Sequence, residues 1–205
     1  MAALTPDTVV GVVGTGAMGA GIAQVAALAG HPVKLLDSRE GAAAQAVTSI
    51  SKQLSKLAEK GKITAETAET ASMRLMAVSN LQDLADCGLV VEAIVEKLEA
   101  KQQLYAQLES IVSTNCLFGT NTSSISVTAI GSALQHPGRL AGLHFFNPAP
   151  IMRLVEVVSG LASDPEVLQT LLDTATAWGK TAVLTRSTPG FIVNRVARPF
   201  YAEGL

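Results

Sequence analysis

The stretch from residue 9 to residue 37 constrains the fold more than any other part of the chain. An apolar run at Val9–Val13 leads into the sequence GTGAMG at residues 14–19, and Val33–Leu36 is a second apolar run. Between the two runs, Ala17–Ala29 is rich in small residues. Short apolar runs are typical of buried strands, and a longer stretch with helical spacing is typical of a helix. Strand, helix and strand in about 30 residues predict a βαβ unit.

The glycines of this turn have separate predicted tasks. Gly14 permits the tight turn, Gly16 lets the backbone approach a phosphate, and Gly19 allows the helix to pack closely on the strand. The free N–H groups at the start of the helix favour a bound pyrophosphate. Ala17 and Met18 open this helix, and we expect them to belong to the same dinucleotide site.

Asp37 ends the second predicted strand and helps to distinguish NAD from NADP as the ligand. Its carboxylate can accept hydrogen bonds from the hydroxyls of an adenine ribose, and its charge would repel a 2′-phosphate. Arg39 leaves an alternative open, because an arginine at this place could bind that phosphate. The segment predicts NAD in preference to NADP, against the alternative of a glycine turn that serves packing alone.

The rest of the chain alternates between strand and helix patterns. Further strands are predicted at Gly88–Ile94, Cys116–Gly119, Arg139–Phe145, Met152–Val158 and Lys180–Leu184. Helices are predicted at Gly41–Lys60, Thr64–Leu75, Lys97–Val112, Pro165–Trp178 and Phe191–Tyr201. This alternation predicts an α/β fold of the Rossmann type, with a doubly wound, mainly parallel sheet.

Composition supports this class and excludes others. Of the 205 residues 48% are hydrophobic and 16% charged, and the formal net charge is −2. Such a chain suits a buried sheet and lacks the basic surface of a nucleic-acid-binding protein. Without an apolar run of about 18 residues or a basic leader, we expect a cytoplasmic protein that does not contact membranes. Cys87 and Cys116 are isolated, like the histidines, so we expect no metal site.

A histidine and a glutamate are the strongest catalytic candidates. His144 lies at the end of a predicted strand, at the edge where open α/β sheets bind ligands. Strand alternation places Glu156 on the apolar face of Met152–Val158, where a carboxylate needs a partner. His144 is the nearest candidate, and such a pair fixes one imidazole tautomer. The alternatives are a structural histidine and, for Glu156, exposure at an edge strand or a pair with Arg153.

Several segments together resemble a known family. The sequences LHFFNP at residues 143–148 and PGFIVNR at residues 189–195 are its specific signatures. Further matching segments are Gly14–Ala23, Val90–Lys101, Asn121–Ser124, Gly142–Pro150 and Leu154–Val158. On these residues the chain resembles the N-terminal part of the L-3-hydroxyacyl-CoA dehydrogenases, which include the 3-hydroxybutyryl-CoA dehydrogenases.

The resemblance implies a role for each matching polar residue. His144 is the general base for the substrate 3-hydroxyl, and Glu156 orients it. Ser123 and Asn194 hydrogen-bond the reacting oxygen or the thioester, and Ser123 also faces the cofactor. The residues implied on the nicotinamide-ribose side are Glu96, Lys101 and Asn147. Taken without the family, Ser123 could cap a helix, Glu96 and Lys101 could form a solvated pair, and Asn194 could be a surface residue.

The family also implies a coenzyme A site on the helix predicted at Gly41–Lys60. Lys52, Lys56 and Lys60 recur every four residues and form one stripe. Lys60 is the best positional match for a phosphate of the coenzyme. For Lys52 and Lys56 we favour a solvated helix face.

The predicted organisation is an NAD-binding domain at residues 1–187, followed at 188–205 by a linker and the first helix of a C-terminal helical domain. The full-length protein is expected to be a homodimer that oxidises acyl-CoA substrates. For this chain we expect NAD binding with little turnover. The alternatives are a sugar-acid dehydrogenase of the gulonate type and a non-catalytic NAD-binding module.

Overall fold

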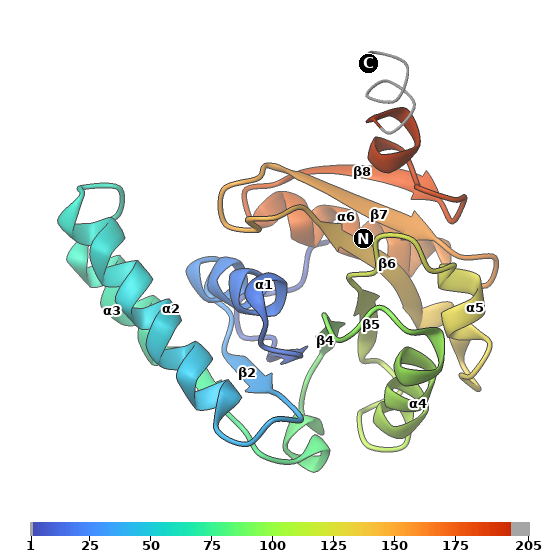
Figure 1. Ribbon diagram of the computed structural model, residues 1–205, viewed down its shortest axis with the longest axis horizontal. Coiled ribbons are helices and arrows are strands. Elements are labelled where there is room, and N and C mark those ends of the chain that lie inside the picture. Colours follow the sequence, from blue (N-terminus) through green and yellow to red (C-terminus); the bar gives the residue numbers. More distant parts are fainter. Residues whose placement is uncertain (1, 198–205) are drawn as a thin grey trace.

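The computed structural model describes residues 2–197 and contains one eight-stranded sheet (Figure 1). The strands run in the order β3-β2-β1-β4-β5-β6-β7-β8. Their bounds are β1 Val10–Val13, β2 Val33–Leu36, β3 Leu75–Ala77, β4 Leu89–Glu92, β5 Leu117–Thr120, β6 Leu140–Phe145, β7 Leu154–Ser159 and β8 Thr181–Arg186. Strands β1 to β6 are parallel, β7 runs antiparallel to β6, and β8 is parallel to β7. The predicted Rossmann-type sheet is confirmed.

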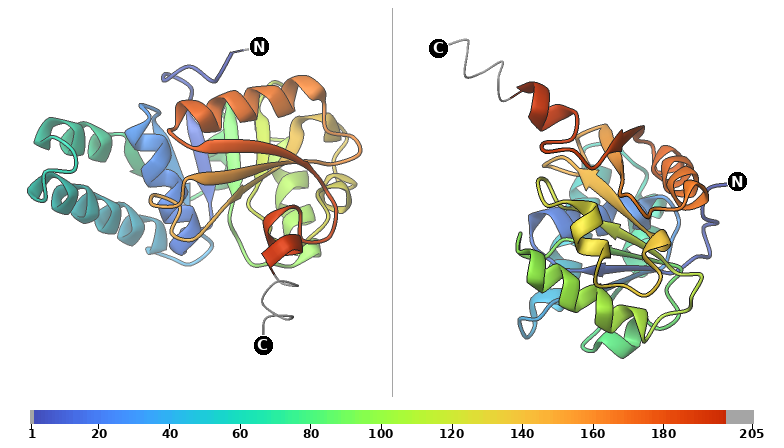
Figure 2. Two further views of the ribbon diagram at one scale, coloured as in Figure 1. Left: turned by 90° about the horizontal axis from the view of Figure 1, so that it is seen from above. Right: turned by 90° about the vertical axis from the view of Figure 1, so that its right-hand side faces the viewer.

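Helices cover both faces of the sheet (Figure 2). Their bounds are α1 Ala17–Leu28, α2 Ala42–Glu59, α3 Ala65–Met73, α4 Leu98–Glu109, α5 Val127–Gly131 and α6 Pro165–Ala177, with short 3₁₀ turns at Leu81–Leu84 and Pro137–Arg139. One buried apolar cluster joins the sheet to α1, α2, α3 and α6, and a second joins it to α4 and α5. The six strands between the edge strands β3 and β8 are therefore buried on both sides, which explains their mostly apolar runs.

The strand order reverses between β1 and β4. The chain first builds outward from β1 to β3 and then restarts on the other side of β1 with β4. Ligands of open α/β sheets bind at the carboxyl ends of the strands beside such a reversal. The turns after β1, β2, β4, β5 and β6 all lie at this edge, because these strands are parallel.

One prediction about the sheet is wrong. The helix expected at Thr64–Leu75 ends at Met73, and Leu75 begins the edge strand β3. Thr64 is the N-cap, as expected, because its side chain accepts a hydrogen bond from the N–H of Thr67 at 3.0 Å. In β3 only Leu75 is buried. A three-residue edge strand shows no period of its own, so the helical pattern before it masks it.

The end of the described chain differs from the predicted helix Phe191–Tyr201. Residues 193–197 are helical, whereas Phe191 and Ile192 form a turn that precedes them. The remaining residues of that prediction lie outside the described residues. Among residues 2–197, no helix combines the length and the apolar character that crossing a membrane requires.

Candidate active site

The glycine turn has two positions fixed by packing and one left open. A Cβ on Gly14, whose φ is +90°, would lie 2.6 Å from the carbonyl oxygen of Ala93, and one on Gly19 would lie 1.8 Å from that of Gly14. A Cβ on Gly16 would meet nothing within 4 Å. Internal packing therefore explains Gly14 and Gly19 but not Gly16. The open space above Gly16, at the N-cap of α1, fits the predicted approach of a pyrophosphate.

Asp37 is held by hydrogen bonds after β2. The N–H and the hydroxyl of Thr15 donate to Oδ2 of Asp37 at 2.8 and 2.7 Å, and Nε of Arg39 lies 3.1 Å from Oδ1. Burial opposes ionisation, but the hydrogen bonds from Arg39 and Thr15 outweigh it and hold the pKa of Asp37 well below its ordinary value. Asp37 is thus an ionised acceptor beside the turn. The guanidinium of Arg39, proposed as the alternative phosphate ligand, is paired with Asp37 in this structure.

His144 and Glu156 face each other across two antiparallel strands. They are directly opposite in the register of β6 and β7, and Nδ1 of His144 lies 2.7 Å from Oε2 of Glu156. The side chains are 5% and 0% exposed. A carboxylate can only accept hydrogen bonds, so Nδ1 carries the proton and Nε2 of a neutral imidazole is left as an acceptor. The predicted contact is confirmed, and Arg153 is not the partner that the alternative required.

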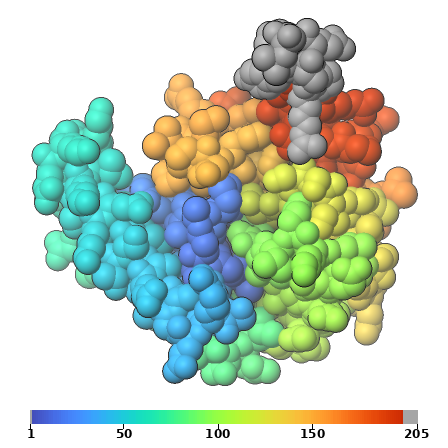
Figure 3. Space-filling view, viewed as in Figure 1, coloured from blue at the N-terminus to red at the C-terminus, as the bar shows by residue number. Residues whose placement is uncertain are grey.

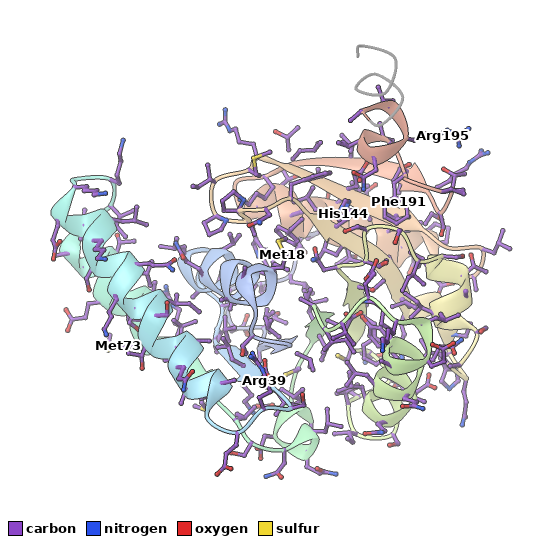
Figure 4. All side chains as sticks on the ribbon, viewed as in Figure 1. Met18, Arg39, Met73, His144, Phe191 and Arg195 are labelled. Carbon is purple, nitrogen blue, oxygen red and sulfur yellow. The ribbon has the colours of Figure 1, made fainter. Side chains whose placement is uncertain are left out.

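Two phenylalanines enclose the imidazole. The ring of Phe146 has its centroid 4.5 Å from that of His144. The ring of Phe191 lies edge-on to His144 at 5.6 Å, and both of these residues are labelled in Figure 4. Phe146 follows β6, whereas Phe191 belongs to the turn after β8. Residues far apart in the chain therefore shape the surroundings of the predicted base.

The loop after β5 is fixed by Glu96. One carboxylate oxygen, Oε1, accepts hydrogen bonds from the hydroxyl of Thr122 at 2.6 Å and from the N–H of Ser123 at 2.9 Å. Burial opposes ionisation, but these bonds and nearby Lys101 lower the pKa of Glu96 overall. The amide Nδ2 of Asn194 donates to the carbonyl oxygen of Ser123 at 3.3 Å. The structure therefore brings Ser123, Glu96 and Asn194 together.

Two alternatives for these residues are wrong. The N-cap of α5 is Ser126, so Ser123 does not cap that helix. Lys101 does not form a solvated pair, because its side chain is only 1% exposed. Its ammonium lies 2.5 Å from Oε1 of Glu92 and 3.3 Å from Oε2 of Glu96.

Glu92 is a site residue that sequence reasoning missed. It ends β4 fully buried, and the hydroxyl of Thr120 donates to its second oxygen at 2.8 Å. A buried acid needs such partners. The signal was present, since Glu92 closes an apolar run and Lys101 lies among apolar residues of the next helix.

A cavity lies between α1, α2 and the segment after β6, seen in blue, cyan and orange in Figure 3. It has a volume of about 740 Å³ and begins at the glycine turn. On its α2 side the cavity is lined by polar side chains among the apolar residues Ala42, Ala46 and Leu57. The polar ones are Gln45, Ser49, Gln53 and Lys56. Asn147 lines the opposite side. Lys56 is exposed, as expected, and it also lines this cavity. Lys60 is the C-cap residue of α2 and is not among the lining residues.

The two cysteines and a metal site are the remaining candidates for chemistry. Burial raises the pKa of the Cys87 and Cys116 thiols to about 12 each, so both are protonated near neutrality. Over the described residues, no group of three histidine, cysteine, aspartate or glutamate side chains could hold a metal ion.

Fold and site together define a dinucleotide-binding domain of the Rossmann class. The family described as "3-hydroxyacyl-CoA dehydrogenase, NAD binding domain" matches residues 9–188. The chain belongs to this family, and NAD is its cofactor.

Named relatives agree with this assignment. The 3-hydroxyadipyl-CoA dehydrogenase of Escherichia coli is 52% identical over 95% of this chain and 41% of its own length. A probable 3-hydroxybutyryl-CoA dehydrogenase of Deinococcus radiodurans is 43% identical over 95% of this chain and 70% of its own length. A crystal structure of 3-hydroxybutyryl-CoA dehydrogenase from Escherichia coli superposes with a TM-score of 0.94, at 52% identity, over 98% of this chain and 42% of the other. This chain thus spans well under half of the first relative and of that crystal structure.

Proposed function

We propose that this chain carries the NAD site and the catalytic base for oxidation of an L-3-hydroxyacyl-CoA to the 3-ketoacyl-CoA, a reversible reaction. The observation that carries the proposal is the buried contact between Nδ1 of His144 and Glu156, at the sheet edge that also holds the glycine turn. Bound NAD supplies the hydride acceptor.

In this proposal each residue of the site has a role that follows from its position. Nε2 of His144 removes the proton of the 3-hydroxyl, and Glu156 stabilises the imidazolium that forms. Ser123 and Asn194, which hydrogen-bond each other, hold the substrate oxygen in place. Glu96 and Asn147 face the nicotinamide ribose. Lys101, being buried against Glu92, acts on that side through Glu96 rather than by direct contact.

We propose further that the cavity beside α2 receives part of the coenzyme A. Its volume of about 740 Å³ lies in the range of ligand pockets. Its mostly apolar lining, with a few polar side chains from α2, suits a ligand that carries amide and phosphate groups on an apolar chain. No ion pair within the described residues occupies Lys56. Lys60 remains the predicted phosphate ligand from the family, with Lys56 as the cation at the cavity itself.

The organisation of the whole protein is also a proposal. We propose an NAD-binding unit at residues 1–187, a second helical domain that begins within 188–205, and a cytoplasmic homodimer. The greater length of the relatives supports the second domain. Because such a domain would complete the acyl site, we expect little multiple turnover from this chain.

The test is single-turnover hydride transfer. Excess 205-residue chain is mixed with NADH and acetoacetyl-CoA, and absorbance is followed beside a His144→Ala control. We expect NADH oxidation that depends on His144. Oxidation of a gulonate-type sugar acid with NAD, without reaction on acetoacetyl-CoA, would instead support the gulonate-type alternative. NADH binding without any hydride transfer would support the non-catalytic module.

The acyl group is left open by the relatives, whose names differ there. One relative is a 3-hydroxyadipyl-CoA dehydrogenase and another a probable 3-hydroxybutyryl-CoA dehydrogenase. Comparing 3-hydroxybutyryl-CoA with 3-hydroxyadipyl-CoA in the NAD-reducing direction measures which acyl group this chain accepts.

A further inference from the structure

Two backbone N–H groups from a distant segment bind the carboxylate that faces His144. Ile192 and Val193 both donate to Oε1 of Glu156, at 2.9 and 3.0 Å, while Oε2 receives Nδ1 of His144. Glu156 is 0% exposed, so bulk water cannot replace these donors. Each oxygen of the carboxylate therefore has its own partner within the protein.

We infer that Ile192 and Val193 are positioning residues for His144. Their N–H groups keep Oε2 of Glu156 aimed at Nδ1, which keeps the proton on Nδ1 and leaves Nε2 free to accept the substrate proton. The inference rests on the proposed role of His144 as the base. It assigns a catalytic consequence to backbone groups, which no side-chain pattern in the sequence indicates.

Packing fixes the turn that presents these N–H groups. Phe191 has a φ of +48°, a conformation that costs a non-glycine residue about 1 kcal/mol. Its side chain is only 3% exposed, lies in the apolar cluster with Val158, and contacts the His144 ring. Burial of the aromatic ring offsets the backbone cost. The N–H pair is thus held by the same ring that encloses the imidazole.

The turn that presents these N–H groups lies beyond the part of the chain that matches the NAD-binding family. The family match ends at residue 188, before Phe191, Ile192 and Val193. The segment that builds the dinucleotide fold therefore does not contain all the groups that prepare the base. The turn after β8 completes the arrangement.

The test removes one N–H group and little else. Val193 begins the helical residues 193–197, a first position where proline is well accommodated, and proline lacks the N–H. Val193→Pro is compared with Val193→Ala, which shortens the same side chain and keeps the N–H. In the 205-residue chain, ¹⁵N NMR of the imidazole gives the tautomer of His144, and single-turnover reduction of acetoacetyl-CoA gives the hydride-transfer rate.

Relative to Val193→Ala, we expect Val193→Pro to show a mixture of both tautomers and hydride transfer about tenfold slower, with an unchanged NADH dissociation constant. A single Nδ1–H tautomer and an equal rate in both variants would overturn the inference. The tautomer is measured without substrate, so a wild-type chain that ignores acetoacetyl-CoA would overturn the proposed function and not this result.

A second measurement avoids proline altogether. If Val193→Pro does not fold, the amide protons of Ile192 and Val193 are compared between the wild-type chain and Glu156→Gln. Loss of the charged acceptor is expected to move both resonances upfield. Unchanged resonances would contradict the hydrogen bonds on which the inference depends.

Discussion

The dinucleotide turn and the catalytic centre are built in opposite ways. The turn is local, since Gly14, Gly16, Gly19 and Asp37 all lie within one βαβ unit. The centre gathers a histidine from β6, a glutamate from β7 and backbone groups from the turn after β8. A local motif can be recognised and substituted as a unit. A centre assembled from separate segments fails wherever one of its partners is moved.

The largest expected effect is on the assembled centre. In Glu156→Gln the amide keeps the size of the side chain but no longer requires a proton on Nδ1 of His144. We expect hydride transfer to fall about 10³-fold while NADH binding is retained. Single-turnover kinetics and NADH fluorescence titration measure the two quantities. A loss of less than about threefold would show that the imidazole needs no carboxylate to orient it.

The next effect concerns the buried ion pair between the two regions. In Lys101→Met, the buried Glu92 loses its cation, and we expect the free energy of unfolding to fall by about 3 kcal/mol. Lys97→Met is the matched control, because Lys97 is exposed and precedes the same helix. Urea unfolding of both variants gives the comparison. Equal losses of stability in the two variants would mean that buried Glu92 does not need the ammonium of Lys101.

The two glycines of the turn separate packing from binding. Gly19→Ala places a Cβ against the backbone of Gly14, so we expect a loss of about 2 kcal/mol in stability. Gly16→Ala meets no protein atom, so we expect its stability to be kept and its NADH affinity to fall. Urea unfolding and fluorescence titration distinguish the two. Gly16→Ala with full NADH affinity would contradict the place assigned to the pyrophosphate.

The smallest effect is the pH dependence carried by Asp37. Burial works against the charge, but hydrogen bonds from Arg39 and Thr15 lower the pKa of Asp37 in the folded chain. Its contribution to stability is therefore complete above the ordinary aspartate pKa, about 3.9, and is lost as the pH falls through the lower folded value. We expect the stability difference between wild type and Asp37→Asn to be constant from pH 5 to about 8 and to shrink below about pH 4. A difference that does not change with pH would contradict this.

The sequence predicts nearly all of the secondary structure around the dinucleotide turn, but only part of the catalytic centre. The strand, turn and helix from Val10 to Asp37 could be predicted because their pattern lies in one continuous segment. The contact between His144 and Glu156 could be predicted because strand alternation left a buried carboxylate in need of a partner. Each of these arguments uses a pattern of side chains along the chain.

The features that escaped depend on tertiary contacts. Glu92 closes an apolar run, which marks it as a buried acid, but its pairing with Lys101 is visible only once β4 and α4 are packed together. The donors on Glu156 are backbone N–H groups, which every residue but proline carries, so no residue type marks them. The conformation of Phe191 likewise follows from burial of its ring rather than from local preference.

The most direct test of the account measures NADH binding and hydride transfer in the same preparations of wild type, His144→Ala and Gly16→Ala. We expect His144→Ala to bind NADH like the wild type but to transfer hydride to acetoacetyl-CoA about 10²- to 10⁴-fold more slowly. We expect Gly16→Ala to lose NADH affinity and, when saturated with NADH, to transfer hydride normally. Hydride transfer at the wild-type rate by His144→Ala would contradict the central claim that this histidine, held by Glu156, is the base.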